Sequence, residues 1–303
     1  MKRVLVCGSN GLLGQRLAWL LDADEEYEVL HTSHHRSFAQ PEILIDYTQL
    51  DISNRSDVKS LVTSFRPDVI LNAAAMTNVD ACEREREQAW KMNVTAVENL
   101  VEVSRRIGAR LVHVSTDYVF DGKTGNYSET DRVNPVNYYG KTKLAGENVL
   151  ISSGIDFAIL RTIVVYGTGV NVKNNFALWV LNNLSDRKPI RCAVDQISNP
   201  THVHDLAMVM KQCLEFDARG IFHVAGAEPI SRYDFALRAA EVFGYDPSLI
   251  ARSKSSDLEQ LAPRPLHTTF TIEKTKRIFR YHPMNITQGL KLLQEELTGI
   301  HLN

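Results

Sequence analysis

Tyr139 and Lys143 stand four residues apart and are the pair in this sequence whose chemistry is easiest to state. In a helix, residues i and i+4 share a face, so both side chains can reach one ligand. A tyrosine with a pKa of about 10 is a poor acid at neutral pH, and a lysine ammonium one turn away lowers that pKa by stabilising the phenolate. Such a phenol can protonate an alkoxide as hydride adds to a carbonyl carbon. The pair therefore predicts carbonyl reduction.

A hydroxyl pair that could polarise this carbonyl closes an apolar run, at Ser115 and Thr116. The carboxyl ends of strands in open α/β sheets face the ligand crevice. We expect Thr116 to hydrogen-bond the substrate oxygen, with Ser115 as the alternative. Ser115 is also expected to lie against the cofactor.

Three glycines follow the first apolar strand and open a helix, with the spacing G-x-x-G-x-x-G. Glycines let the backbone approach a pyrophosphate, and the helix N-terminus offers free N–H groups and partial positive charge. The strand before and the helix after favour a dinucleotide site over a plain tight turn. The expected cofactor contacts of this loop are Gly8, Asn10, Gly11, Leu12, Leu13 and Gly14.

The segment after the second strand, Thr32-Ser-His-His-Arg36, bears on which dinucleotide binds. A free ribose 2′-hydroxyl usually meets Asp or Glu at this place, and no carboxylate is present. Arg36 can pair with a 2′-phosphate, helped by Ser33 and by His34 or His35. The alternative is a solvated loop arginine. We therefore expect NADPH, with NADH left open.

Strand and helix patterns alternate through the first half of the chain, which predicts a Rossmann-type doubly wound α/β fold with helices on both faces of a parallel sheet. One helix follows Ser53 and stops at Pro67, with its apolar residues spaced i, i+3, i+4 and i+7. The predicted strands are continuous apolar runs, typical of strands buried on both faces. They are Arg3–Cys7, Glu28–Thr32, Asp68–Ala73, Arg110–Ser115 and Phe157–Val165.

The second half is less regular. We expect a helix capped by Asp205, a further sheet strand at 220–226, and a loop at 195–200. The change of rhythm predicts a dinucleotide-binding domain over residues 1–165, to which residues 195–226 return. A smaller α/β substrate-binding region is then expected from residues 166–194 and 227–303.

Composition excludes several classes of protein. The 303 residues are 44% hydrophobic and 23% charged, with a net charge of −2, so we expect neither nucleic-acid nor membrane partners. No apolar run approaches the roughly 20 residues that span a bilayer. The four cysteines form no CxxC pair, which favours a reducing cytoplasm over a disulfide scaffold. A soluble, cytoplasmic enzyme is the expectation.

Two longer motifs extend this picture: Ser115-Thr-Asp-Tyr-Val-Phe-Asp-Gly122 and Pro135-Val-Asn-Tyr-Tyr-Gly-Lys-Thr-Lys-Leu-Ala-Gly-Glu147. With Arg66-Pro-Asp-Val-Ile-Leu-Asn-Ala-Ala-Ala75, they closely resemble the dTDP-4-dehydrorhamnose reductases, which are short-chain dehydrogenases/reductases of the extended type. The resemblance spans nearly the whole chain. It implies reduction of the 4-keto group of a deoxy-sugar nucleotide by NADPH or NADH.

The resemblance also implies roles for single residues. Asn93 matches the asparagine that holds a helix kink and a proton-relay water in such enzymes, although a plain buried polar residue is an equal alternative. The residues expected against the cofactor are Asp51, Ile52, Ala73, Ala74 and Ala75. The residues expected to bind substrate are Thr116, Tyr118, Val164, Asn175, Gln196 and Arg264.

The sequence departs from these reductases at two places. Val164 stands where they often carry a tryptophan against the sugar, and Gln15 lies where some members carry a metal-binding glutamate at a dimer interface. We therefore predict no metal, and isolated pairs such as His202 and His204 usually have structural roles. A homodimer stays open.

The chain also resembles the regulatory β subunit of methionine adenosyltransferase, which shares the reductase fold. Three functions therefore remain: a sugar-nucleotide reductase, a non-catalytic NADP-binding regulatory subunit, and an epimerase or dehydratase. A dehydratase would add acidic residues beside the catalytic hydroxyl, and Asp117 follows Thr116 without a glutamate after it. The intact Thr116, Tyr139 and Lys143 set favours the reductase.

Overall fold

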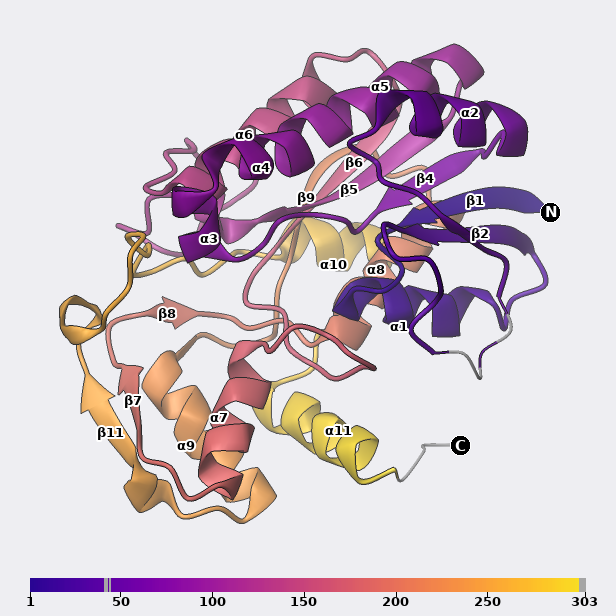
Figure 1. Ribbon diagram of the computed structural model, residues 1–303. Helices are drawn as coiled ribbons and strands as arrows, with labels where there is room; N and C mark the ends of the chain where they lie inside the picture. Colours follow the sequence, from indigo (N-terminus) through magenta and orange to yellow (C-terminus); the bar gives the residue numbers. More distant parts are fainter. Residues whose placement is uncertain (41–42, 44, 300–303) are drawn as a thin grey trace.

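The computed structural model describes residues 1–40, 43 and 45–299 and is built on a seven-stranded parallel sheet (Figure 1). The strand order is β3-β2-β1-β4-β5-β6-β9, with the order reversing on either side of β1. Ligands bind at such a reversal in doubly wound sheets. The strands are β1 (Lys2–Cys7), β2 (Tyr27–Ser33), β3 (Tyr47–Gln49), β4 (Val69–Asn72), β5 (Arg110–Thr116), β6 (Phe157–Thr162) and β9 (Gly220–Val224).

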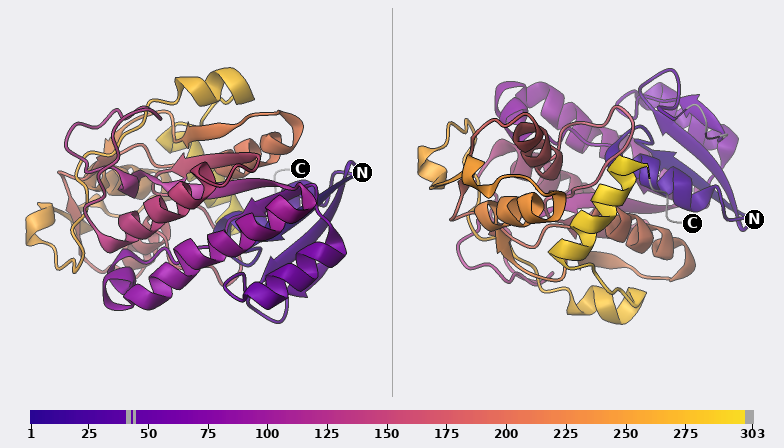
Figure 2. Two further views of the ribbon diagram at one scale, coloured as in Figure 1. Left: turned by 90° about the horizontal axis from the view of Figure 1, so that it is seen from above. Right: turned by 90° about the horizontal axis from the view of Figure 1, so that it is seen from below.

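Helices cover both faces of this sheet (Figures 1 and 2). The first set comprises α1 (Leu12–Leu21), α8 (Val203–Glu215) and α10 (Glu273–Phe279), and the second comprises α2 (Arg55–Phe65), α5 (Ala96–Ile107) and α6 (Tyr138–Ile151). Because strand side chains alternate, Val4 and Val6 pack with the first set while Leu5 and Cys7 pack with the second. The predicted Rossmann-type fold is confirmed.

A second group of helices and short strands lies at one end of the molecule, outside the seven-stranded sheet (Figure 1). It contains α7 (Phe176–Ser185), α9 (Arg232–Phe243) and α11 (Ile286–Thr298), with β7 (Ile190–Ala193) parallel to β11 (Ile250–Ser253) and β8 (Ile197–Ser198) antiparallel to β10 (Ile230–Ser231). These elements share a separate apolar core that includes Leu181, Phe235 and Leu290. The remaining helices, α3 (Val79–Arg84) and α4 (Arg86–Trp90), lie before α5.

The further sheet strand predicted at 220–226 is present as β9, which pairs with β6, so the chain returns to the sheet after α7. The later helix α10 also packs on the sheet, with Phe279 edge-on to Phe222 at 5.0 Å between ring centroids. Segments of the second half thus contribute to both cores. The predicted division of the chain into two domains stays a prediction. One domain would comprise residues 1–165 with 195–226, and the other residues 166–194 with 227–303, of which 300–303 lie outside the described residues.

Three local predictions were wrong. Strand β6 ends at Thr162 rather than residue 165, because Val164 has a φ of 41°, which breaks an extended strand. Asp205 lies inside the first turn of α8, and His202 caps that helix by accepting from the His204 N–H. The predicted loop at 195–200 contains β8. In the part of the chain described above, no helix is both long and apolar enough to cross a bilayer.

A buried ion pair attaches α6 to the sheet. Arg161 on β6 donates two hydrogen bonds to Glu147 on α6, at 2.9 and 2.7 Å, and the side chains are 3% and 0% exposed. A charge left alone at such a site is strongly destabilising, so the pair holds the helix in one place. That helix carries Tyr139 and Lys143.

Replacing Glu147 with alanine should lower the free energy of unfolding by about 3–5 kcal/mol, because Arg161 would remain buried without a partner. The matched control is Glu102→Ala, which removes an equally bidentate pair with Arg55 at the surface. Exposed pairs contribute little, so the control should unfold at nearly the wild-type temperature. Thermal unfolding followed by circular dichroism measures both. Equal midpoints for the two variants would contradict the structural role of the Glu147 pair.

Candidate active site

The glycine loop packs directly against the segment after β4. Gly8 has a φ of 90°, and a Cβ there would lie 2.8 Å from the Ala74 nitrogen. A Cβ on Gly14 would overlap the Gly8 carbonyl. Gly11, at the N-cap of α1, provides no side-chain cap, which leaves N–H groups of the first turn available to an anion. Gly8, Gly11, Gly14, Ala73 and Ala74 are therefore brought together as one cradle.

The loop after β2 is held by side chains rather than left free. Asn10 donates to the Ser37 carbonyl at 2.9 Å and accepts from the Ala39 N–H at 3.0 Å. Tyr47 donates to the His35 carbonyl and meets the Ser33 hydroxyl, both at 2.7 Å. Asn10 thus shapes the loop through both ends of its amide, a role that the sequence did not reveal. Tyr47 has no motif around it and was missed.

Arg36 and His34 are exposed on this loop, which contacts Asn10 of the glycine segment through Ser37 and Ala39. Burial and the neighbouring His35 hold the pKa of His34 below its ordinary value. The imidazole is therefore largely neutral at pH 7, which leaves Arg36 as the loop's positive charge. Ser33 lies at the end of β2, before both.

Asp51 and Ile52 follow β3 as predicted. The Asp51 carboxylate accepts from the backbone N–H and the hydroxyl of Ser53, at 2.9 and 2.7 Å. Burial opposes its charge, but these bonds and the nearby Lys91 hold the pKa of Asp51 below its ordinary value. Ile52 is buried, and its carbonyl accepts from Asn99 at 3.0 Å. Asp51 is thus a fixed anion at the carboxyl end of the sheet.

Tyr139 and Lys143 lie on the buried side of α6, whose first turn is capped by Asn137 through the Gly140 N–H at 2.8 Å. The Lys143 Nζ donates to the Val114 carbonyl at 2.7 Å and lies 3.1 Å from the His113 Nε2. Both partners belong to β5, so the lysine ties α6 to the strand that ends in Thr116.

A line of hydrogen bonds continues from Lys143 to the glycine cradle. Asn72 accepts from the Ala74 N–H at 3.1 Å, so its Nδ2 faces the His113 Nδ1, at 3.0 Å, as a donor. Burial lowers the pKa of Lys143 to about 8, so its amine is still mostly protonated at neutral pH. Burial and the Lys143 charge hold the pKa of His113 well below its ordinary value, so the imidazole between Asn72 and Lys143 is neutral.

The expected lowering of the Tyr139 pKa by Lys143 is not what the structure has. Burial raises the pKa of Tyr139, and the hydrogen bond with Thr116 offsets only part of that rise. The physical reason is twofold: desolvation disfavours the phenolate, and Lys143 is engaged by His113 and Val114. Tyr139 is therefore held as a neutral phenol, the form that can donate a proton.

Thr116 lies at the centre of a hydroxyl and carboxyl cluster. Its Oγ1 accepts from the Tyr118 N–H at 3.2 Å and donates to Asp117 at 3.0 Å. Thr268 donates to the other Asp117 oxygen at 2.6 Å. Burial raises the pKa of Asp117 to about 6, against the opposing effect of the two threonine hydroxyls. Thr268 lies more than 150 residues away in the chain, and nothing in its sequence surroundings indicated a role here.

Ser115, the alternative to Thr116, is in a different position. Its hydroxyl is buried, and within the described ranges it has no hydrogen-bond partner. It does not share the contact that Thr116 makes with Tyr139. The structure therefore favours Thr116 as the hydroxyl of the Tyr139 group.

Asn93 lies in a π-helical turn, Lys91–Thr95, between α4 and α5. Its amide accepts from the Met76 N–H at 2.9 Å and donates to the Met76 carbonyl at 3.1 Å and to Thr142 at 3.0 Å. A Cβ on Gly146 would lie 2.5 Å from the Asn93 carbonyl, so α6 approaches closely here. The expected irregular helix is present, and Asn93 joins it to α6 and to the segment after β4. The relay water stays a prediction.

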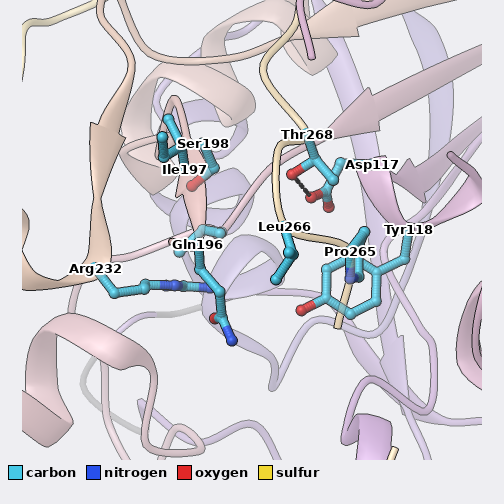
Figure 3. Close-up of a pocket in the computed structure, with 10 residues that line it drawn as sticks. Asp117, Tyr118, Gln196, Ile197, Ser198, Arg232, Pro265, Leu266 and Thr268 are labelled. Carbon is cyan, nitrogen blue, oxygen red and sulfur yellow. Dashed lines mark hydrogen bonds between the residues drawn. The ribbon is translucent and has the colours of Figure 1, made fainter. Parts of the chain in front are cut away.

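A small pocket opens beside Asp117 (Figure 3). Of the predicted substrate residues, Tyr118, Val164 and Gln196 line it. Tyr118 lies edge-on to Tyr139, with ring centroids 5.7 Å apart, so one lining residue contacts the proposed proton donor. The pocket is lined by Asp117, Tyr118, Val164, Gln196, Ile197, Ser198, Arg232, Pro265, Leu266 and Thr268.

Two predicted substrate residues are engaged elsewhere. Asn175 caps α7 by accepting from the Leu178 N–H at 3.2 Å and donates to the Gly167 carbonyl at 2.8 Å. Arg264 forms an ion pair with Asp80 at 3.0 Å and donates to the Ala262 carbonyl at 2.8 Å. Neither is among the residues that line the pocket. The sequence missed Arg232, whose helix start gave no sign of a ligand.

The metal prediction can be addressed only within the described ranges. There, no three His, Cys, Asp or Glu side chains gather closely enough to form a metal site. Gln15, at the position considered for a metal, donates to the Val170 carbonyl at 2.8 Å and accepts from the Val170 N–H at 2.9 Å. Its amide ties α1 to the segment before α7.

The doubly wound sheet, the glycine cradle and the Thr116, Tyr139 and Lys143 set together define a short-chain dehydrogenase/reductase of the extended type. Residues 1–298 match the family model described as the RmlD substrate binding domain, and the chain belongs to that family. The predicted resemblance, the NAD(P)-dependent reductase class and the fold are thereby confirmed.

Similar proteins fall into two groups. A dTDP-4-dehydrorhamnose reductase from Aggregatibacter actinomycetemcomitans is 36% identical, over 96% of this chain and 98% of that protein. The methionine adenosyltransferase 2 subunit beta of Xenopus laevis is 32% identical, over 91% of this chain and 82% of that protein. Among solved structures, dTDP-4-dehydrorhamnose reductase from Bacillus anthracis in complex with NADP has a TM-score of 0.87 at 30% identity, covering 98% of this chain and all of that one.

Replacing Tyr139 with phenylalanine should abolish turnover and leave cofactor affinity nearly unchanged, because only the transferable proton is removed. The matched control is Tyr138→Phe at the neighbouring residue. Tyr138 is only half-buried, and its ring centroid lies 5.0 Å from the Arg86 guanidinium. Steady-state rates and cofactor titration by nicotinamide fluorescence measure both effects. Full activity in Tyr139→Phe would show that the proton donor has been misassigned.

Proposed function

We propose that this protein reduces the 4-keto group of a deoxy-sugar nucleotide with NADPH, converting dTDP-4-dehydro-L-rhamnose to dTDP-L-rhamnose. The observation that carries the proposal is the hydrogen bond between Tyr139 and Thr116 beside a pocket that the neighbouring residues Asp117 and Tyr118 line. A carbonyl held there lies within reach of both hydroxyls. The similar reductases support the substrate class.

The residues present fit a dinucleotide. Side chains at Gly8 or Gly14 would collide with the neighbouring backbone, so this segment is built for close approach rather than for packing alone. When bound there, NADPH supplies the hydride. The positive loop residue Arg36 and the absence of a carboxylate from residues 32–36 support a 2′-phosphate. The complex of the Bacillus anthracis reductase with NADP adds further support.

The protein's own part in the reaction is proton delivery and orientation. Thr116 would donate to the ketone oxygen, releasing the bond it now makes to Asp117. Tyr139 would transfer its phenolic proton to that oxygen as the carbonyl carbon is reduced, leaving an alcohol and a phenolate. Lys143, one turn further along α6 and mostly protonated at neutral pH, would then favour the phenolate through its positive charge until a proton from solvent restores the phenol.

The second candidate is a non-catalytic subunit that binds NADP and regulates a partner enzyme. The observation that favours it is the 32% identity to a methionine adenosyltransferase β subunit over most of both chains. Epimerase and dehydratase structures at 17–22% identity show the fold alone.

We further propose that the enzyme is located in the cytoplasm. A homodimer also remains a proposal.

The assay that decides between these functions supplies NADPH and dTDP-4-dehydro-L-rhamnose to the purified protein. We expect loss of absorbance from NADPH and formation of dTDP-L-rhamnose, identified by mass. Val164, in place of a larger aromatic side chain, leaves the sugar less tightly packed, so related 4-keto sugar nucleotides should also react. Tight cofactor binding without turnover on any of them would transfer the assignment to the regulatory subunit.

Replacing Arg36 with alanine should weaken NADPH binding by roughly ten- to a hundredfold, or about 1.5–3 kcal/mol, because a charge-assisted contact with the 2′-phosphate is lost. NADH, which lacks that phosphate, serves as the internal control and should bind as before. Fluorescence titration of both cofactors gives the two affinities. Equal losses would mean that Arg36 does not read the phosphate.

A further inference from the structure

Arg232 is the first residue of α9, and its side chain extends into the pocket toward Gln196 (Figure 3). The guanidinium lies over the Phe176 ring, 4.5 Å from its centroid. Its backbone N–H is anchored by the Gln196 carbonyl at 3.1 Å. The start of α9 and the ring below therefore fix the direction of this side chain from both sides.

Arg232 and Asp117 line the same pocket and attract each other without direct contact. Within the described part of the chain Arg232 forms no ion pair, and its Nη1 is buried without a hydrogen-bond partner. Burial lowers the pKa of its guanidinium, and the surrounding groups, including Tyr118 and Asp117, offset only part of this effect. Arginine nevertheless remains charged in proteins. An enclosed charge without a partner is unfavourable, and an arriving anion would relieve it.

The other charges near the pocket do not compete for such an anion. Arg264 is already paired with Asp80. Asp117 is engaged by the hydroxyls of Thr116 and Thr268, and although burial raises its pKa to about 6, it is still mostly a carboxylate at pH 7 and cannot itself bind an anion. Among the lining residues, Arg232 is the one that carries a positive charge.

We propose that Arg232 binds the diphosphate of the sugar-nucleotide substrate. This inference rests on the proposed function and names the group that holds the substrate's charge. The pocket extends from Asp117 and Tyr118, beside the proposed proton donor, past Val164 to Arg232. A sugar whose ketone lies at Tyr139 directs its opposite end, where the diphosphate is attached, toward the arginine. The planar guanidinium matches phosphate oxygens with two parallel hydrogen bonds.

The test measures dTDP binding by calorimetry, with the cofactor site saturated with NADP⁺ so that dTDP cannot occupy it. Arg232→Met keeps an apolar chain over Phe176 and removes the charge, and Arg232→Lys retains a charge without the planar fork. The matched control is Arg252→Met, because Arg252 is an exposed arginine that also lies over an aromatic ring, Tyr233, at 5.1 Å. Thermal midpoints and NADP⁺ affinities of all variants report on folding.

We expect Arg232→Met to lower dTDP affinity by about ten- to a hundredfold, Arg232→Lys to recover part of it, and Arg252→Met to match wild type. In turnover, KM should rise far more than kcat falls. Unchanged dTDP affinity in Arg232→Met would overturn the inference. It would be overturned also if the variant bound dTDP as wild type does and lost affinity only for a nucleotide sugar with a carboxylate on its ring, because Arg232 would then bind that carboxylate and not the diphosphate. If wild-type protein bound no dTDP at all, the proposed function itself would fall, and this assignment with it.

Discussion

The hydrogen-bonded line from the Ala74 backbone through Asn72 and His113 to Lys143 is the constraint on which the site depends. Ala74 packs against Gly8, so one end of the line meets the cofactor cradle. The other end fixes α6, which carries the phenol. Because Asn72, His113 and Lys143 are buried, a break at any of them would leave an unpaired polar group in an apolar interior. The cradle and the proton donor are therefore held in register by side chains, not by loop geometry.

Asp117, Tyr139 and Arg232 show how the same burial gives three different results. It holds Tyr139 as a neutral phenol, raises the pKa of Asp117 to about 6, and, within the described residues, leaves the Nη1 of the charged Arg232 without a hydrogen-bond partner. Val164 lies among these residues with a φ of 41°, an uncommon and strained conformation for a β-branched side chain. Strain and unpaired charge both collect at this pocket, where a ligand could compensate for them, while the surrounding core is apolar and regular.

Much of the fold was accessible from the sequence because its signals are local. The apolar runs of β1, β4 and β5 are continuous, since both faces of the sheet are covered, and the stop at Pro67 ends a helix through its own chemistry. Predictions failed where tertiary contacts override local preference. The backbone at Val164 ends β6 early, and β8 is a strand only because β10 lies beside it.

The sequence by itself determined the class of chemistry. A glycine loop between strand and helix, and a tyrosine and lysine one helical turn apart, are short-range patterns whose meaning follows from backbone geometry. Only the tertiary structure decided the electrostatics and the pocket. Thr268 reaches Asp117 across 151 residues of sequence, and among the residues described Arg232 forms no ion pair whereas Arg264 pairs with Asp80. Burial and ion pairing are properties of the packed chain, so no local sequence pattern could predict which arginine would form an ion pair and which would remain available to a ligand.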